Sequence, residues 1–477
     1  MQPWNNIPIA PRKLLQAAIP QGQAVVAATK QFNKKPYKSD ALTALMGAAL
    51  ILPGISGQAA EIGVRSEKTT ISVLHAEFEE SSERMSIVVD QLSVTSPIGK
   101  DFEGNFSAIR DITSGASPVV NFLDGNGTPH QFLETGASIK DQRDIYDASL
   151  SYFGEDSLST IKLGTSTEDD YESTYGAIDY RIDLNRKLTS LTFSYGHSDD
   201  KVWNSYNPSV LLEEPSIFNH RQKDEFSISI GQVFNRSTTI QFSLTYAKSK
   251  GFLSDPYKKV FVVDEALFDF RPLNIDIAGI FRFLVDTGVI KFFNDSGITK
   301  LINDSPAIDV SFLSEALLGV IKENRPSERN QWISLLRFSH YFKSTTSALH
   351  TDYRYANDDW GANSHTLEFK WNVDLGNGWQ VSPGLRYYTQ HSADFYDTYF
   401  ESIPDDGYLS SDYRLAGFGV ISKKLEISKT FSRDFTVYLH YENYDRQYKY
   451  ALGSETNGGD LDDFSFEMIS VSLDVSF

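Results

Sequence analysis

Charged side chains alternate with apolar ones along several segments of the sequence. In 366–374, "TLEFKWNVD", Glu368 and Lys370 are each flanked by apolar or aromatic residues. A period of two places the charged residues on one face of a strand and the apolar residues on the other. Ten residues on such faces are candidates for one polar wall: Asp179, Arg181, His350, Asp352, Arg354, Glu368, Lys370, Arg386, Lys424 and Glu426. Opposed charges along a wall would select among dissolved ions and small polar solutes.

A second chemistry is available to part of this set. His350, Asp352 and Arg354 share one polar face, and a histidine beside a carboxylate can serve as a general base. The sequence contains no G-x-S-x-G nucleophile motif, P-loop, G-x-G-x-x-G, H-E-x-x-H or C-x-x-C-H. We therefore favour ion pairing within a wet wall over a hydrolase, and we expect no enzymatic activity, no catalytic residue and no organic cofactor.

Acidic clusters recur between the alternating segments. They read "FLDGNGTPH" (122–130), "STEDDYES" (166–173), "NDDWG" (357–361), "PDDGYLSSD" (404–412) and "GSETNGGDLDD" (453–463). Clustered carboxylates with glycine can bind Ca²⁺, but none of these has the twelve-residue spacing of a helix–loop–helix calcium site. Solvated turns are the preferred interpretation, and calcium is the alternative.

Composition excludes several classes of protein. The 477 residues include no cysteine, so no disulfide, thiolate nucleophile or cysteine-ligated zinc is possible. Aromatic residues make up 13% of the chain, with 24 Tyr and 32 Phe. The net charge is −19 and becomes −24 without residues 1–60, which hold six basic residues and one acidic residue. This charge argues against nucleic acid as a partner.

Residues 38–60 have the layout of a secretory signal peptide. Three lysines at 34, 35 and 38 precede an apolar run over 41–55, and small residues follow it. We expect cleavage after Ala60, with residues 1–60 forming an N-terminal extension and signal peptide. The alternative is a helix or plug that the mature protein keeps. The stretch before residue 36 is longer than a usual basic region, which indicates either an unusual extension or a start codon placed too far upstream.

Alternating segments fill the rest of the chain, residues 61–477. Sixteen candidate strands are 69–79, 84–95, 103–111, 142–153, 157–166, 172–183, 187–197, 223–234, 236–249, 329–342, 346–357, 364–375, 378–390, 411–428, 433–447 and 464–477. The first three, within 69–111, alternate poorly. Apart from 41–55 no apolar run approaches the length of a membrane-spanning helix.

The connections between these segments separate into two groups. Those after even-numbered strands are short, such as "LNR" and "LGNG", whereas many after odd-numbered strands are long. Short turns on one side and long loops on the other are typical of an outer-membrane barrel. The sequence thus predicts an all-β fold: a transmembrane antiparallel up-and-down barrel of about 16 strands, with lipid outside, charged residues facing a wet lumen, and aromatic girdles at the strand ends.

The last segment, "EMISVSLDVSF", alternates from Ile469 to Phe477. It is the predicted closing strand of the barrel. In outer-membrane proteins such a strand ending in Phe is commonly the segment that the insertion machinery reads, so we expect that machinery to be a partner.

The connection 259–328 is the longest, and two stretches in it have helical spacing, 275–293 and 305–324. Examples are Phe312, Leu317 and Ile321. We predict a helical extracellular insertion that is either a lid or partner-docking element, or an ordered loop packed on itself. "SDPYK" (254–258) and "SADFY" (392–396) lie at outer strand ends, where they either shape the barrel mouth or form rim turns.

Several stretches resemble one family of uncharacterised Gram-negative outer-membrane β-barrels, known only as a domain of unknown function. They are "SGASP" (114–118), "LSDPYK" (253–258), "RNQW" (329–332), "LHTDYRYANDDWG" (349–361), "SHTLEFKW" (364–371), "LRYYTQHSADFY" (385–396) and "SSDYRLAGFG" (410–419). The resemblance covers roughly 61–477. It implies a β-barrel in the cell outer membrane and brings no activity and no site residues; the long front end and the long 259–328 insertion depart from the family pattern.

These observations favour a channel for small solutes or for a secreted substrate, with outer-membrane lipid around it. The alternative is a non-conducting barrel scaffold whose loops hold a periplasmic or surface protein partner.

Overall fold

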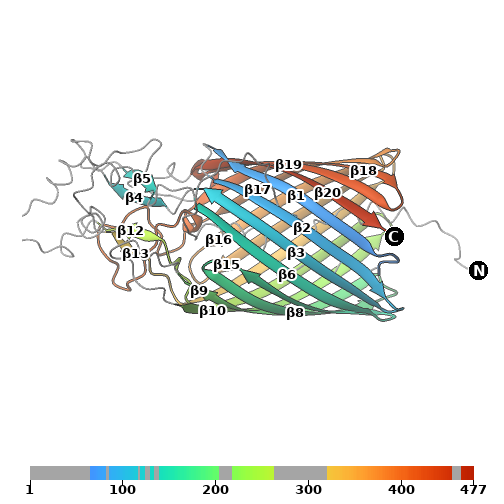
Figure 1. The fold of residues 1–477 in the computed structure, drawn as a ribbon, viewed down its shortest axis with the longest axis horizontal. Coiled ribbons are helices and arrows are strands. Elements are labelled where there is room, and N and C mark those ends of the chain that lie inside the picture. Colours follow the sequence, from blue (N-terminus) through green and yellow to red (C-terminus); the bar gives the residue numbers. More distant parts are fainter. Residues whose placement is uncertain are drawn as a thin grey trace, which may run out of the picture.

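The computed structural model describes residues 65–81, 85–115, 119–123, 129–133, 139–203, 218–262, 320–453 and 463–477. Sixteen antiparallel strands in these ranges close into a barrel, and β20 pairs with β1 to seal it (Figure 1). The barrel strands are β1 (Thr70–Glu80), β2 (Met85–Ile98), β3 (Phe102–Gly115), β6 (Ile139–Phe153), β7 (Ser157–Thr167), β8 (Tyr171–Leu184), β9 (Thr189–Val202), β10 (Asn219–Asn235), β11 (Thr238–Gly251), β14 (Glu328–Phe342), β15 (Ser347–Asp358), β16 (Asn363–Gly376), β17 (Trp379–Gln390), β18 (Phe418–Ser432), β19 (Phe435–Gln447) and β20 (Phe464–Ser476). The predicted strand count and fold class are confirmed.

Register shows which side chains share a face, because residues directly opposite in an antiparallel pair point the same way. On β20, Ile469, Val471, Leu473 and Val475 are large exposed apolar side chains, and the serines and aspartate between them are less exposed. The same division holds on the other strands, with exposed Phe, Leu, Ile and Trp on the outer face. An apolar outer face of this extent suits hydrocarbon rather than water.

The two ends of the barrel differ, as the sequence predicts. One end has only short turns: 99–101, 154–156, 185–188, 236–237, 343–346, 377–378 and 433–434. The β16–β17 turn is held by Asn377 and Gly378, whose φ values of 53° and 78° suit a tight hairpin. All the long connections (116–138, 203–218, 252–327, 391–417 and 448–463) lie at the other end, on the left of Figure 1. Among the described residues, no helix is long and apolar enough to cross a membrane.

Exposed ion pairs mark where the outer apolar band ends, near the long loops. His75 and Asp90 approach to 2.7 Å on the outside of β1 and β2, and Glu328 contacts Lys250 at 2.9 Å. Outward tyrosines bind polar neighbours at this level; Tyr195 donates to Asp224 at 2.7 Å. Rings with apolar edges and hydroxyl tips are suited to a boundary between lipid and water. The predicted girdle is present at this boundary.

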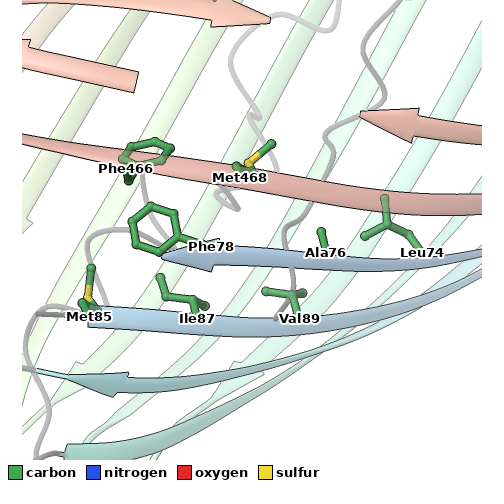
Figure 2. Close-up of a cluster of buried hydrophobic side chains, with 8 residues drawn as sticks. All are labelled: Leu74, Ala76, Phe78, Met85, Ile87, Val89, Phe466 and Met468. Atoms are coloured by element: carbon green, nitrogen blue, oxygen red, sulfur yellow. The ribbon is translucent and has the colours of Figure 1, made fainter. Parts of the chain in front are cut away.

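Beyond that boundary the pattern of β1 and β2 reverses. Inner side chains there are apolar and buried, and Figure 2 shows them grouped along β1, β2 and β20. We call this group the seam cluster: Leu74, Ala76, Phe78, Met85, Ile87, Val89, Phe466 and Met468. The rings of Phe78 and Phe466 are 4.4 Å apart. The expectation of a wholly polar lumen is therefore wrong at the seam, and the poor alternation of 69–111 has a physical cause.

Two other expectations need correction. The predicted strand 411–428 begins only at Phe418, because the preceding residues form a loop with the short 3₁₀ helix η4 (Tyr413–Leu415). The helical insertion is not found: its described ends pair as strands β12 (Lys259–Phe261) and β13 (Val320–Lys322), so Ile321 lies in a strand. Residues 263–319 lie outside the described residues, as do 1–60. A second small hairpin, β4 (Val119–Leu123) and β5 (Pro129–Leu133), lies at the same end.

Candidate functional site: the lumen wall and the loop cluster

All ten residues predicted to share a polar wall lie on the inner face of the barrel. Arg354 on β15 is opposite Thr366, which is opposite Tyr388, so one row crosses β15, β16 and β17. One step toward the short turns, the next row holds Asp352, Glu368 and Arg386. The row after that holds His350, Lys370 and Lys424, and Glu426 follows it on β18. Asp179 and Arg181 face inward from β8, on a separate part of the wall.

Ion pairs link strands that are two apart in the barrel. Lys424 on β18 contacts Glu368 on β16 at 2.8 Å, and Lys370 contacts Glu426 at 3.2 Å. Gly384 on the intervening β17 has no side chain to separate them; a Cβ there would lie 3.2 Å from that of Lys424. Inner side chains on a concave surface converge, which is why these next-nearest strands can bond. The structure thus brings four predicted site residues into two crossed pairs.

His350 and Asp352 are adjacent on the wall but do not bond each other. Arg337 on β14 holds Asp352 through two nitrogens, at 2.8 and 3.1 Å. The His350 ring instead lies 2.8 Å from Ser339 Oγ through Nδ1, while its Nε2 has no hydrogen-bond partner among the described groups. A catalytic histidine is usually oriented by a third group, and no carboxylate fills that position here.

The wall around β6–β10 carries its own ion pairs. Arg181 contacts Asp183 at 2.7 Å, and Arg221 contacts Asp200 at 2.7 Å. The buried Arg143 lies between Asp111 and Glu168, at 2.9 and 3.3 Å. Cations on this side are matched by carboxylates, so this part of the wall is polar without an excess of positive charge.

A buried ionic group in the loops was not predicted from the sequence. We call it the loop cluster: Asp255, Glu323, Arg325, Asp412 and Arg414. Arg414 contacts Asp255 at 2.8 Å and Asp412 through Nε at 2.7 Å. Arg325 bridges Asp412 and Glu323, the latter at 2.7 Å. The 252–327 connection is thereby joined to the 391–417 connection.

Apolar side chains pack around this ionic group. Trp360, Phe395 and Leu415 form one buried cluster, with the Trp360 and Phe395 rings edge-to-face at 5.1 Å. Val260 and Leu409 belong to another, beneath the β12–β13 hairpin. The "SDPYK" and "SADFY" segments therefore form part of a packed structure over the barrel mouth rather than isolated rim turns.

The loop cluster is anchored at distant points of the barrel. Tyr257 donates to Asp170 in the β7–β8 turn at 2.7 Å. On the other side, Arg446 of β19 donates to the Tyr413 carbonyl at 2.7 Å, and its guanidinium lies 3.7 Å from the Phe418 ring. The contacts thus extend from the β7–β8 turn to β19, between well-separated positions in the strand order.

Charge is strongly stabilised inside this cluster. Burial by itself would raise the pKa of Asp412, but the charges of Arg414 and Arg325 outweigh it and hold that pKa far below its usual range. Burial also opposes the charge of Arg414, yet Asp412 and Asp255 raise its pKa above the ordinary value. The cluster is therefore ionised throughout the neutral pH range.

The acidic segments that suggested calcium bind protein groups where they are described. Asp358 accepts from Arg329 Nε at 2.7 Å, Asp359 accepts from Asn330, and Asp170 accepts from Tyr257. Within the described ranges no three His, Asp or Glu residues are grouped as metal ligands. Residues 124–128 and 454–462 of the other two segments lie outside the described residues.

An apolar outer face, a charged inner face and loops gathered at one end define this chain as a transmembrane-type antiparallel β-barrel with a polar lumen wall. The chain belongs to the family described as "Protein of unknown function (DUF3570)", whose model matches residues 42–467. The family resemblance drawn from the motifs is thereby confirmed.

Solved structures with the same type of fold include three outer-membrane proteins. A bacterial polysaccharide outer membrane secretin is 7% identical with a TM-score of 0.41, covering 86% of this chain and 98% of that one. CdiB from Acinetobacter baumannii is 8% identical with a TM-score of 0.44, covering 86% and 60%. The outer membrane protein opdK from Pseudomonas aeruginosa is 10% identical with a TM-score of 0.37, covering 86% and 99%. No curated protein matches the chain.

Proposed function

We propose that this barrel is a channel of the Gram-negative outer membrane, through which small polar solutes or a secreted substrate pass. The observation that carries the proposal is the inner wall, where all ten predicted charged residues face the lumen and are hydrogen-bonded or ion-paired across strands. Such a wall is costly unless water fills the space beside it. A barrel of sixteen strands is also wide enough to enclose an aqueous path.

The loop cluster sets the access to that path. Because its ion pairs join loops from separate parts of the rim, it narrows the mouth on the long-loop side. We expect solutes to enter around it, past the rows that begin with Arg354 and Asp352. The proposal gives the barrel no enzymatic role and no cofactor: His350 and Ser339 serve as polar wall groups. Export by a signal peptide and assembly through the C-terminal strand belong to the same proposal.

The test is single-channel recording in planar bilayers with the mature chain. We expect discrete current steps from the full-length mature protein. A second variant with 263–319 replaced by a short turn keeps β12, β13 and the loop cluster, and should conduct at least as well. If neither protein gives current steps after folding is verified by heat-dependent migration on gels, the channel proposal is wrong.

The loop cluster also supports the alternative of a non-conducting scaffold. A rigid, ion-paired platform at the barrel mouth is a suitable surface for a protein partner, and nothing in its geometry requires passage through the lumen. Co-purification in mild detergent separates the two proposals. A stoichiometric partner together with an electrically silent barrel would favour the scaffold, whereas conduction by the purified chain alone favours the channel.

A further inference from the structure

Two arginines of the lumen wall differ from the other cations around them. Within the described inner wall of β14–β18, Arg329, Arg337, Lys370 and Lys424 each bind a carboxylate. Arg354 and Arg386 bind none. Arg354 is exposed toward the lumen, and the Nε of Arg386 is buried without a hydrogen-bond acceptor.

The carboxylates that face these two arginines are already occupied. Asp352 is held by Arg337 through two nitrogens. Glu368 lies directly opposite Arg386 but is bound by Lys424 at 2.8 Å. Glu225, which also acts electrostatically on Arg354, is paired with Lys223 at 2.6 Å. The wall therefore neutralises its other cations and leaves this pair uncompensated.

The two guanidinium groups are near enough to repel each other. Tyr388 belongs to the same row as Arg354, and its ring centroid lies 5.9 Å from the Arg386 guanidinium carbon. Like charges in a partly dehydrated site destabilise each other unless an anion is placed between them. A planar guanidinium matches the two oxygens of a carboxylate, and a neighbouring ring provides an apolar contact for the rest of the molecule.

We propose that Arg354 and Arg386 form a binding site in the lumen for the carboxylate of an organic anion. The inference rests on the proposed channel, and it names the class of solute: a small carboxylate, held by two guanidinium groups below the loop cluster while its body lies against Tyr388. By contrast Arg446, which also binds no carboxylate among the described residues, is buried against ring faces and the Tyr413 carbonyl and serves as an anchor.

The test compares wild type, the double variant R354Q/R386Q and the control R236Q. Arg236 lies in the exposed β10–β11 turn, so its replacement removes the same kind of charge outside the site. Two quantities are measured in bilayers: the anion-to-cation preference in a KCl gradient, and block of the current by benzoate compared with its neutral analogue benzamide. Folding of each variant is checked by heat-dependent migration, and the single variants R354Q and R386Q serve if the double variant does not fold.

In wild type and R236Q we expect block by benzoate and little block by benzamide. In the double variant, benzoate should lose about tenfold or more in apparent affinity, since a charged hydrogen bond is lost, and the preference should move toward cations. Unchanged preference and unchanged block would overturn the site while leaving the channel intact. Equal block by benzamide would also overturn it.

If the wild-type protein is electrically silent, the channel proposal fails and the site is tested alone. Benzoate is then titrated calorimetrically into the folded protein in detergent. Binding to wild type that is lost in R354Q/R386Q supports the carboxylate site, and absence of benzoate binding overturns it.

Discussion

At the scale of single residues, close contacts on the inner wall depend on very small side chains. Gly164 on β7 lies under Tyr175 of β8, whose hydroxyl donates to Asp147 on β6. A Cβ added to Gly164 would come within 2.3 Å of the Tyr175 ring. The glycine therefore allows the tyrosine to cross β7 and bond a strand beyond its neighbour.

Gly164→Val should displace Tyr175 and break its bond to Asp147. Overpacking of this kind costs about 1–3 kcal/mol. The measurement is urea-induced unfolding in detergent, followed by heat-dependent migration. Ala148→Val is the matched control, because Ala148 is exposed on the outer face of β6 and has room for two methyl groups. Equal midpoints for the two variants would contradict the described contact.

Asp412→Asn should open the loop cluster without unfolding the barrel. The substitution leaves Arg325 and Arg414 without their shared carboxylate, and breaking a buried ion pair costs about 3–5 kcal/mol. Limited proteolysis should then cut within 391–417 while the strands stay resistant. Asp405→Asn, at an exposed position in the same loop, should leave the wild-type digestion pattern unchanged.

The loop cluster should also resist mild acid. Because the native pKa of Asp412 is lowered, its stabilising contribution is complete above the unfolded value of about 4 and is lost only as pH falls through the lower native value. Protease resistance of 391–417 should therefore be the same at pH 7 and at about pH 5 when an acid-tolerant protease is used at both. Opening of the loops already at pH 5 would show that Asp412 is not ionised by its arginine neighbours.

At the scale of elements, the strands are two-faced, and the two faces tolerate opposite changes. On β11, Phe242 is an exposed apolar side chain and Gln241 belongs to the inner face. Phe242→Lys places a charge in hydrocarbon, which costs about 2–4 kcal/mol near the bilayer midplane. Gln241→Lys should fold like wild type. The fraction of heat-modifiable barrel recovered after refolding into lipid vesicles measures both, and equal recovery would argue against a lipid-facing Phe242.

The strands were predictable because each has a local period that does not depend on distant partners. Ile469 to Phe477 alternates over the length of β20, and the ten wall residues were assigned to the correct face by the same rule. The pattern was weak in β1 and β2, where inner residues such as Phe78 and Ile87 are apolar and the outside carries His75 and Asp90. Outside the lipid band the rule that charged residues face inward no longer holds.

The loop cluster was not predictable from spacing. Asp255 and Arg414 are 159 residues apart, and neither has a local pattern that selects the other. The motif segments "LSDPYK" and "SSDYRLAGFG" contained its members, but only the closed barrel brings these loops together. Helical spacing in 305–324 was misleading at its end, because Ile321 pairs across to Val260 in a strand.

At the scale of the whole molecule, the central claim is that a ring of sixteen strands separates lipid outside from water inside. The absence of cysteine allows this to be measured directly. Thr366→Cys places a thiol on the inner face of β16, and Leu367→Cys places one on the outer face, one residue away.

Single-channel recording during addition of a charged, membrane-impermeant thiol reagent tests the claim most directly. We predict a stepwise fall in current for Thr366→Cys and no change for Leu367→Cys. Modification of Leu367→Cys with Thr366→Cys unreactive would mean that the faces are assigned the wrong way round, and the account of a polar, water-filled lumen would be contradicted.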